Sequence, residues 1–230
     1  MTLKNDQSRL LALAIIILLV PVAVLAHDVA QSDKAFVSSI EGPAIIPFLY
    51  LGAKHMVTGY DHIAFLVGVV FFLRRLKDVV LYVSLFTLGH STTLLAGVLL
   101  GFGVNAYIID AIIGLSVVYK GVENIGGFQK LGLAINTKLV VLVFGLFHGL
   151  GLATKVQDLE MSRDGLLANL IAFNVGVELG QVIVLSLVVY LFSLWRDRPS
   201  FTRYAFAANV LLIAVGLWLT TIQIQGYLAA

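Results

Sequence analysis

The amino-acid sequence predicts an all-α membrane protein: a polytopic bundle of six transmembrane helices that follows an N-terminal signal peptide. Three observations lead to this fold class. Of the 230 residues, 60% are hydrophobic and 12% are charged, whereas a soluble globular domain is about 45–50% apolar and about 25% charged. The apolar residues form long segments instead of the short alternating strands of a membrane β-barrel. The lysines and arginines gather in every second connection, as in multi-pass membrane proteins.

The first segment has the order of a secretory signal peptide. Lys4 and Arg9 form a short basic region, an apolar run follows, and Ala26 precedes polar His27. We therefore expect residues 1–26 to be a signal peptide that is cleaved after Ala26. His27 would then carry a free amine beside its imidazole and could capture a metal ion in the periplasm, although a solvated terminus is the simpler reading. An uncleaved first transmembrane helix is the alternative for this segment.

The rest of the chain is predicted to form a short periplasmic segment, residues 27–45, and a six-helix transmembrane domain, residues 46–230. A span needs roughly 20 mostly apolar residues. Because lipid offers no hydrogen-bond partners, the backbone must satisfy its own polar groups, and the spans are therefore helices. The six apolar segments lie near residues 46–73, 79–100, 106–122, 139–154, 166–194 and 204–224.

The positions of the basic residues predict the orientation of the bundle. Three alternate connections contain or border Arg74, Arg75, Lys77, Lys120, Lys130, Lys138, Arg196, Arg198 and Arg203. The opposite side carries only Lys34, Lys54, Lys155 and Arg163. The positive-inside rule places the basic connections in the cytoplasm and both mature ends outside. We therefore expect a multi-pass protein of the bacterial inner membrane with a periplasmic mature N-terminus.

Four of the five histidines lie inside strongly apolar stretches: His55, His62, His90 and His148. An ionisable side chain in hydrocarbon costs roughly 2.5–3.5 kcal/mol on insertion scales, so a sequence rarely carries several without a use. With a helix rise of about 1.5 Å per residue, His55, His90 and His148 fall at similar depths, and His62 lies deeper. Imidazole and carboxylate together suit zinc, nickel or cobalt. We therefore predict one buried metal site with these four histidines as ligands.

Acidic and amide side chains accompany the histidines. Asp61 points about a third of a turn from His62 and is expected to orient a histidine on a neighbouring helix. Asn174, Glu178 and Gln181 form one polar stripe along an otherwise apolar helix. We expect Asp61 and Glu178 to balance charge, orient imidazoles or exchange protons. Asn174 and Gln181 are explained equally well by hydrogen bonding between helices and by a place in the site.

The polar positions occur in motifs that resemble a known family. The motifs are His55-x-x-x-Gly59-x-Asp61-His62, Phe86-Thr87-Leu88-Gly89-His90-Ser91, Leu115-Ser116-Val117-Val118-Tyr119 followed by Glu123-Asn124, and Phe144-Gly145-Leu146-Phe147-His148-Gly149-Leu150-Gly151. Together they resemble the HupE/UreJ family of membrane proteins, which is associated with hydrogenase and urease gene clusters. The resemblance is clear over residues 48–153 and weaker over the last two helices.

This resemblance implies a permease for nickel, or for cobalt, because the enzymes of both gene clusters need nickel. It carries over His55, Asp61, His62, His90 and His148 as the matched polar positions. The family is also similar in having a histidine just after the signal peptide, which His27 would match. Glu178 and Asn174 are candidate site residues because of their place in the polar stripe alone, and not because of the resemblance.

The predicted function is therefore transport of a divalent transition-metal cation across the inner membrane, and not catalysis. The expected partners are the lipid bilayer and the metal ion, and the net charge of +2 gives no indication of nucleic acid. The sequence contains no glycine-rich phosphate-binding motif that would indicate transport driven by ATP. The lack of cysteine excludes metal sites with thiolate ligands. Two alternatives stay open. One is an intramembrane zinc-dependent hydrolase with an open position for water, and the other is a haem-binding electron-transfer bundle.

Overall fold

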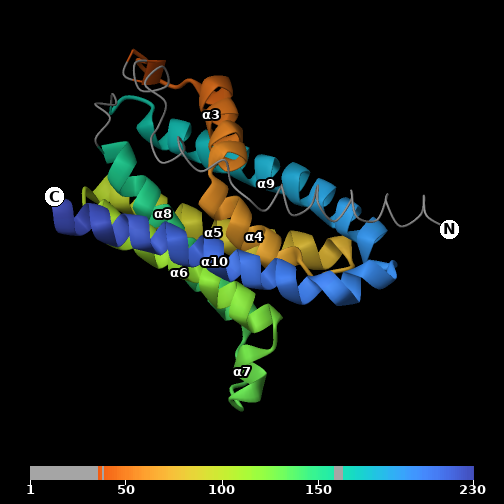
Figure 1. The fold of residues 1–230 in the computed structure, drawn as a ribbon. Helices are drawn as coiled ribbons and strands as arrows, with labels where there is room; N and C mark the ends of the chain where they lie inside the picture. Colours follow the sequence, from red (N-terminus) through yellow and green to blue (C-terminus); the bar gives the residue numbers. More distant parts are fainter. Residues whose placement is uncertain (1–35, 38, 158–162) are drawn as a thin grey trace.

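The computed structural model describes residues 36–37, 39–157 and 163–230; the predicted signal peptide and His27 lie outside them. Every regular element with described bounds is a helix, which confirms the all-α class. The helices are α3 (Ile45–Thr58), α4 (Tyr60–Val70), α5 (Leu76–Leu100), α6 (Ala106–Asn124), α7 (Gly127–Lys130), α8 (Thr137–Gln157), α9 (Leu166–Arg196) and α10 (Pro199–Ala229) (Figure 1). Except for the first, the predicted segments agree with these helices, and the structure extends several ends by a few residues.

Four helices in the described part of the chain are long and apolar enough to cross a membrane: α5, α8, α9 and α10. Helix α6 has 19 residues but carries Asp110, Lys120 and Glu123, which lower its hydropathy. Helices α3 and α4 have 14 and 11 residues, so neither reaches the roughly 20 residues of a span by itself. The membrane-helix character is thus established, and the number of six spans remains a prediction.

The prediction of one helix over residues 46–73 is wrong, because the chain breaks at Gly59. The N–H of Gly59 still donates to the carbonyl of His55 at 2.8 Å, but the ψ angle of Gly59 is 86°, which leaves the helical region. A Cβ atom at Gly59 would lie 3.0 Å from the His55 carbonyl oxygen and 3.1 Å from His62 Nδ1, so the lack of a side chain here makes room for the break. Helix α3 consequently turns away from α4 (Figure 1), and His55 and His62 do not share one helical face.

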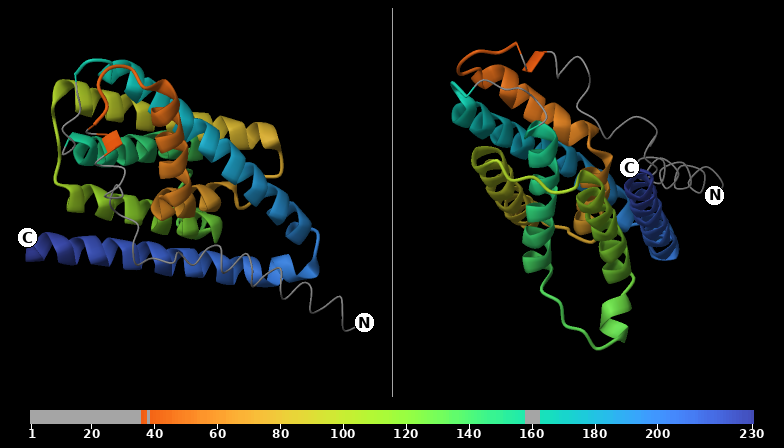
Figure 2. Two further views of the ribbon diagram at one scale, coloured as in Figure 1. Left: turned by 90° about the horizontal axis from the view of Figure 1, so that it is seen from above. Right: turned by 90° about the vertical axis from the view of Figure 1, so that its left-hand side faces the viewer.

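Six helices pack in three close pairs: α3 with α9, α5 with α8, and α6 with α10 (Figure 2). Glycine sets the spacing in each pair. Gly176 of α9 lies against the carbonyl of Leu49, Gly149 of α8 lies against the carbonyl of His90, and Gly114 of α6 lies against α10. A Cβ atom at any of these glycines would overlap the neighbouring backbone. Small residues therefore allow backbone contact, as they do in other membrane bundles.

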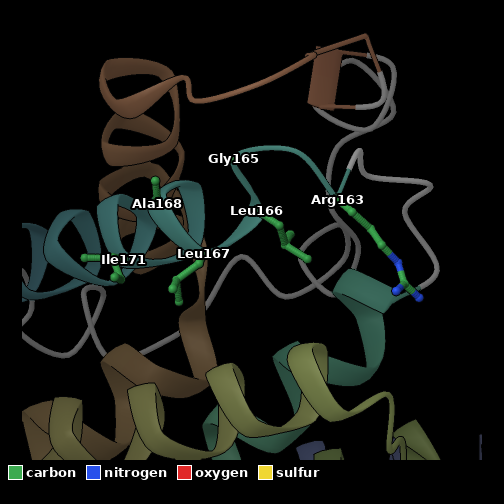
Figure 3. A pocket seen from close by; sticks show the side chains of 6 residues that line it. All are labelled: Arg163, Gly165, Leu166, Leu167, Ala168 and Ile171. Atoms are coloured by element: carbon green, nitrogen blue, oxygen red, sulfur yellow. The ribbon is translucent and has the colours of Figure 1, made fainter.

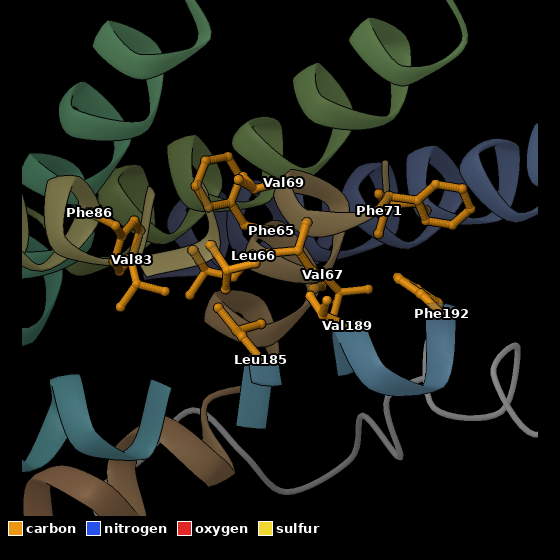
Figure 4. Packing of buried hydrophobic residues seen from close by; sticks show 14 of the residues in the cluster. Phe65, Leu66, Val67, Val69, Phe71, Val83, Phe86, Leu185, Val189 and Phe192 are labelled. Atoms are coloured by element: carbon orange, nitrogen blue, oxygen red, sulfur yellow. The ribbon is translucent and has the colours of Figure 1, made fainter. Parts of the chain in front are cut away.

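Helix α4 occupies the centre of the bundle and is apolar on every side. Phe65, Leu66 and Val67 of α4 pack against Phe86 of α5 and Leu185 of α9 in the main core (Figure 4). A helix that is hydrophobic all round must be covered by protein or lipid. Here protein covers it, and this burial fixes the place of the polar residues at its N-terminal end.

Different polar contacts hold the helices together at the two ends of the bundle. At the end where α3 and α9 begin, Lys155 Nζ lies 2.8 Å from a carboxylate oxygen of buried Asp110. At the opposite end, the guanidinium of Arg196 donates to the carbonyls of Val70 at 2.8 Å and Phe71 at 2.6 Å. This contact adds to the hydrogen bond from the Leu73 N–H to the Val70 carbonyl and helps to satisfy the carbonyls at the end of α4. Helices α5, α8 and α10 begin at this second end, so the predicted basic connections gather there.

Candidate metal centre

The four predicted histidines meet where α3 breaks into α4. Ligand nitrogens of His55, His62 and His90 all lie within 4.8 Å of one another. The ring centroid of His62 is 5.2 Å from that of His55, 6.0 Å from His90 and 4.3 Å from His148. His62 is therefore the centre of this histidine cluster, which draws one residue each from α3, α4, α5 and α8.

The glycine contacts between α5 and α8 bring His148 and His90 to the same level. Gly145 and Gly149 flank His148 and lie against the backbone of Phe86 and His90 on α5. Because the two backbones touch at these points, the side chains between them enter the same small volume. The small residues around His148 thus fix the position of its side chain as well as the packing of α5 against α8.

Asp61 holds the central histidine. Its Oδ1 atom accepts the backbone N–H of His62 at 2.9 Å and lies 2.9 Å from His62 Nδ1. With Nδ1–H donating to the carboxylate, the lone pair of the ring lies on Nε2. The sequence predicted that Asp61 orients a histidine on a neighbouring helix. Here the break at Gly59 puts Asp61 in the first turn of α4, where its carboxylate reaches the next residue.

Most ring nitrogens of the cluster lack a hydrogen-bond partner. In the described part of the chain, this holds for Nε2 of His55 and His62 and for both nitrogens of His90 and His148, all of them buried atoms. His90 is 0% and His148 1% exposed. A buried polar atom left unpaired costs about 1–3 kcal/mol, so native proteins keep few of them. Their concentration at one point indicates a site built for a ligand, and imidazole nitrogens suit nickel, cobalt or zinc.

The polar stripe of α9 faces α5. Ser91 Oγ donates to Asn174 Oδ1 at 2.7 Å, and Thr87 Oγ1 donates to Gln181 Oε1 at 2.7 Å. Ser91 follows His90 in the chain, so the Asn174 contact fixes α5 beside the cluster. The Gln181 Nε2 atom is buried and has no partner among the described residues. Asn174 and Gln181 therefore both form hydrogen bonds between helices, which is one of the two roles that the sequence left open.

Glu178 lies on the same stripe but is only partly buried. Its Oε1 atom accepts a hydrogen bond from Ser84 of α5 at 3.3 Å, in an exposed position. Among the described contacts, its hydrogen bond thus goes to a serine and not to an imidazole. The structure does not bring Glu178 into the histidine cluster with Asp61.

Three phenylalanine rings pack against one side of the histidine cluster, and sequence reasoning did not predict this contact. The ring centroid of His148 is 4.9 Å from that of Phe86 and 5.8 Å from that of Phe65, and Phe65 lies 5.5 Å from Phe144. All three rings lie on the side of the cluster that faces the Arg196 end. A signal was present: Phe86 precedes His90, and Phe144 precedes His148, by four residues, which is one helical turn on the same face.

A shallow hollow on the surface lies apart from this centre. It is found at the start of α9 (Figure 3) and contains none of the four histidines. Its lining consists of Arg163, Gly165, Leu166, Leu167, Ala168 and Ile171. The candidate metal centre is therefore the enclosed cluster within the bundle.

These features define a helical membrane protein with a buried group of histidines. A family model described as HupE / UreJ protein matches residues 31–230, which is nearly the whole chain. The chain therefore belongs to the HupE/UreJ family, which is associated with metal transport. The match confirms the family that the motifs indicated and extends it over the last two helices. No curated protein and no solved structure matches the chain.

Proposed function

We propose that this protein carries a divalent transition-metal cation, nickel or cobalt, across the bacterial inner membrane. The observation that carries the proposal is the meeting of His55, His62 and His90, whose ligand nitrogens lie within 4.8 Å of one another, with His148 against His62. Such a set of neutral imidazoles is a good donor group for nickel and cobalt. The helical membrane character and the metal-transport association of the family support the same role.

The four histidines have different tasks in this proposal. His62 is the central ligand because the Asp61 carboxylate fixes its ring and leaves Nε2 for the metal. His55, His90 and His148 complete the donor set. Asn174 supports the position of His90 through Ser91. Metal binding requires unprotonated imidazoles, so a protonated ring would release its proton as the metal binds. Glu178, which lies outside the cluster, is the carboxylate proposed to accept such protons.

The proposed membrane topology joins α3 and α4 into the first of six spans and counts α6 as the third. A span with a break is tolerated when the freed backbone groups lie inside the protein, and Gly59 is buried. The basic connections at the Arg196 end would face the cytoplasm. Residues 1–26 would be a cleaved signal peptide, and His27 would begin the mature periplasmic segment as a first capture point.

Reconstituted vesicles test the transport. The full-length protein should carry Ni²⁺ or Co²⁺ to a metal-sensitive dye inside the vesicles, and His90→Ala should abolish this flux. Leu88→Ala is the matched control, because Leu88 is 60% exposed on the same helix and should leave flux unchanged. Co²⁺ absorption in detergent reports binding separately. Tight binding without flux under any imposed gradient would overturn the transport role.

A further inference from the structure

The Arg196 end of the bundle contains a second buried polar group that the histidine cluster does not use. Lys120 Nζ lies 2.6 Å from Glu123 Oε2, and the two side chains are only 8% and 14% exposed. The other carboxylate oxygen of Glu123 accepts the hydroxyl of Thr137 at the start of α8. We call Lys120, Glu123 and Thr137 the ion-pair cluster. Desolvation largely offsets the attraction in such a buried pair, so stability alone is a weak reason for it.

The place of Lys120 depends on α4, the helix that carries His62. A Cβ atom at Gly68 of α4 would come within 2.9 Å of Lys120 Cγ, so the glycine makes room for the lysine stem. Asn124 also donates to the Gly68 carbonyl at 2.8 Å. Lys120 and Asn124 therefore both pack on the helix that carries His62.

A continuous column of aromatic rings leads from the histidines to the ion-pair cluster. Below His148 and Phe65, the ring of Phe144 lies 5.6 Å from that of Tyr119. Tyr119 precedes Glu123 by one helical turn on α6, so both lie on one face. The Tyr119 hydroxyl oxygen is buried and has no hydrogen-bond partner in the described residues. Its phenol thus adds an unused oxygen at the inner end of the column.

We propose that Glu123, with Thr137 and Tyr119, is a second cation site on the inner side of the bundle, and that Lys120 is its tethered competitor. The ammonium group occupies the carboxylate while no divalent cation is there, and an arriving cation displaces it. This inference rests on the proposed transport function. Carboxylate, hydroxyl and phenol oxygens hold nickel or cobalt less tightly than imidazoles do. A weaker second site favours release, as in pathways where an ion must bind and then leave.

Equilibrium binding of Co²⁺ to the full-length protein in detergent tests the site itself. Lys120→Met removes the ammonium group but keeps an apolar stem over Gly68. This variant should bind a second, weaker Co²⁺ equivalent at concentrations at which the Lys120 ammonium group excludes that equivalent from the wild-type protein, and Lys120→Met/Glu123→Gln should lose it again. Lys130→Met is the matched control, because Lys130 is exposed on α7. Wild-type stoichiometry in Lys120→Met would overturn the proposal.

Flux in vesicles tests the role of the site. In Lys120→Met/Glu123→Gln, which leaves no unpaired buried charge, the Co²⁺ spectrum of the histidine cluster should persist while flux falls at least about tenfold, the lower range for loss of a supporting group. Wild-type flux in this variant would overturn the release role. Failure of the transport proposal can be told apart from failure of the second site. If the wild-type protein shows no flux, Co²⁺ binding to His90→Ala/Lys120→Met in detergent still decides whether the second site exists, because this variant should retain the weak Co²⁺ equivalent.

Discussion

The histidine cluster and the ion-pair cluster are both buried in the same bundle, but their atoms are satisfied differently. Six ring nitrogens in the first have no partner among the described residues, whereas Glu123 in the second has both oxygens engaged. An unpaired buried donor or acceptor costs free energy that a ligand can recover. In the ion-pair cluster, both carboxylate oxygens of Glu123 already have partners within the chain. The comparison supports the proposals that the first cluster binds a cation and that the Lys120 ammonium group occupies the second.

The two clusters should respond oppositely to truncation, and the largest effect belongs to the ion-pair cluster. Glu123→Ala leaves the Lys120 ammonium buried without its partner, so we expect a loss of about 3–5 kcal/mol in the free energy of unfolding. Unfolding in a dodecyl sulfate titration measures this. The double variant Lys120→Met/Glu123→Ala should recover most of the loss. If Glu123→Ala alone were as stable as the wild-type protein, the distinction between the two clusters would be lost.

The next largest effect concerns the carboxylate that holds the central histidine. Asp61→Asn keeps the shape of the side chain but loses its charge, so His62 Nδ1–H is held less firmly. We expect metal affinity to fall about 10–100-fold, the usual result of removing such an outer partner. Co²⁺ titration followed by absorption measures it. Asn174→Ala removes a neutral amide beside Ser91 and His90, not a charge, and should weaken affinity less; equal effects of the two changes would contradict the central place of His62.

Apolar replacement within the histidine cluster should sharpen the comparison, because it removes unpaired atoms instead of creating them. His90→Leu eliminates two buried nitrogens and fills the space with carbon. Without added metal, the variant should be as stable as wild type or more stable by about 1–2 kcal/mol. Its stabilisation by Ni²⁺ should be lost. Thermal unfolding in detergent, with and without Ni²⁺, measures both quantities. A clear destabilisation of the metal-free variant would show that the ring nitrogens are satisfied in the folded protein.

The smallest effect is expected at the polar ladder between α5 and α9. Thr87→Val removes the hydroxyl that donates to Gln181 but conserves the branched shape. Hydrogen bonds between membrane helices contribute about 0.6 kcal/mol on average, and we expect a loss of this order. Metal affinity should not change, because Thr87 is not in the cluster. A loss of Co²⁺ binding comparable to that of His90→Leu would place this ladder within the metal site.

The sequence by itself determined the helical membrane class, the approximate ends of most helices and the set of histidines worth grouping. These follow from local patterns, since hydrophobicity over a span and the positions of charges need no knowledge of neighbouring helices. The depths estimated along the helices led to the grouping of His55, His90 and His148, whose ring centroids lie 5.2, 6.0 and 4.3 Å from that of His62. The motifs gave the family, which the match over residues 31–230 confirms.

Only the tertiary structure decided how these residues meet. Gly59 ends α3, and this break, not a shared helical face, brings His55 to His62. Asp61 bonds its own neighbour because it falls in the first turn of a new helix. The pairing of Glu123 with Thr137 depends on how α8 packs beside α6. Sequence periodicity shows which side of a helix is buried, but the crossing points of distant helices are set by backbone contacts at glycines, and these contacts exist only once the helices have packed.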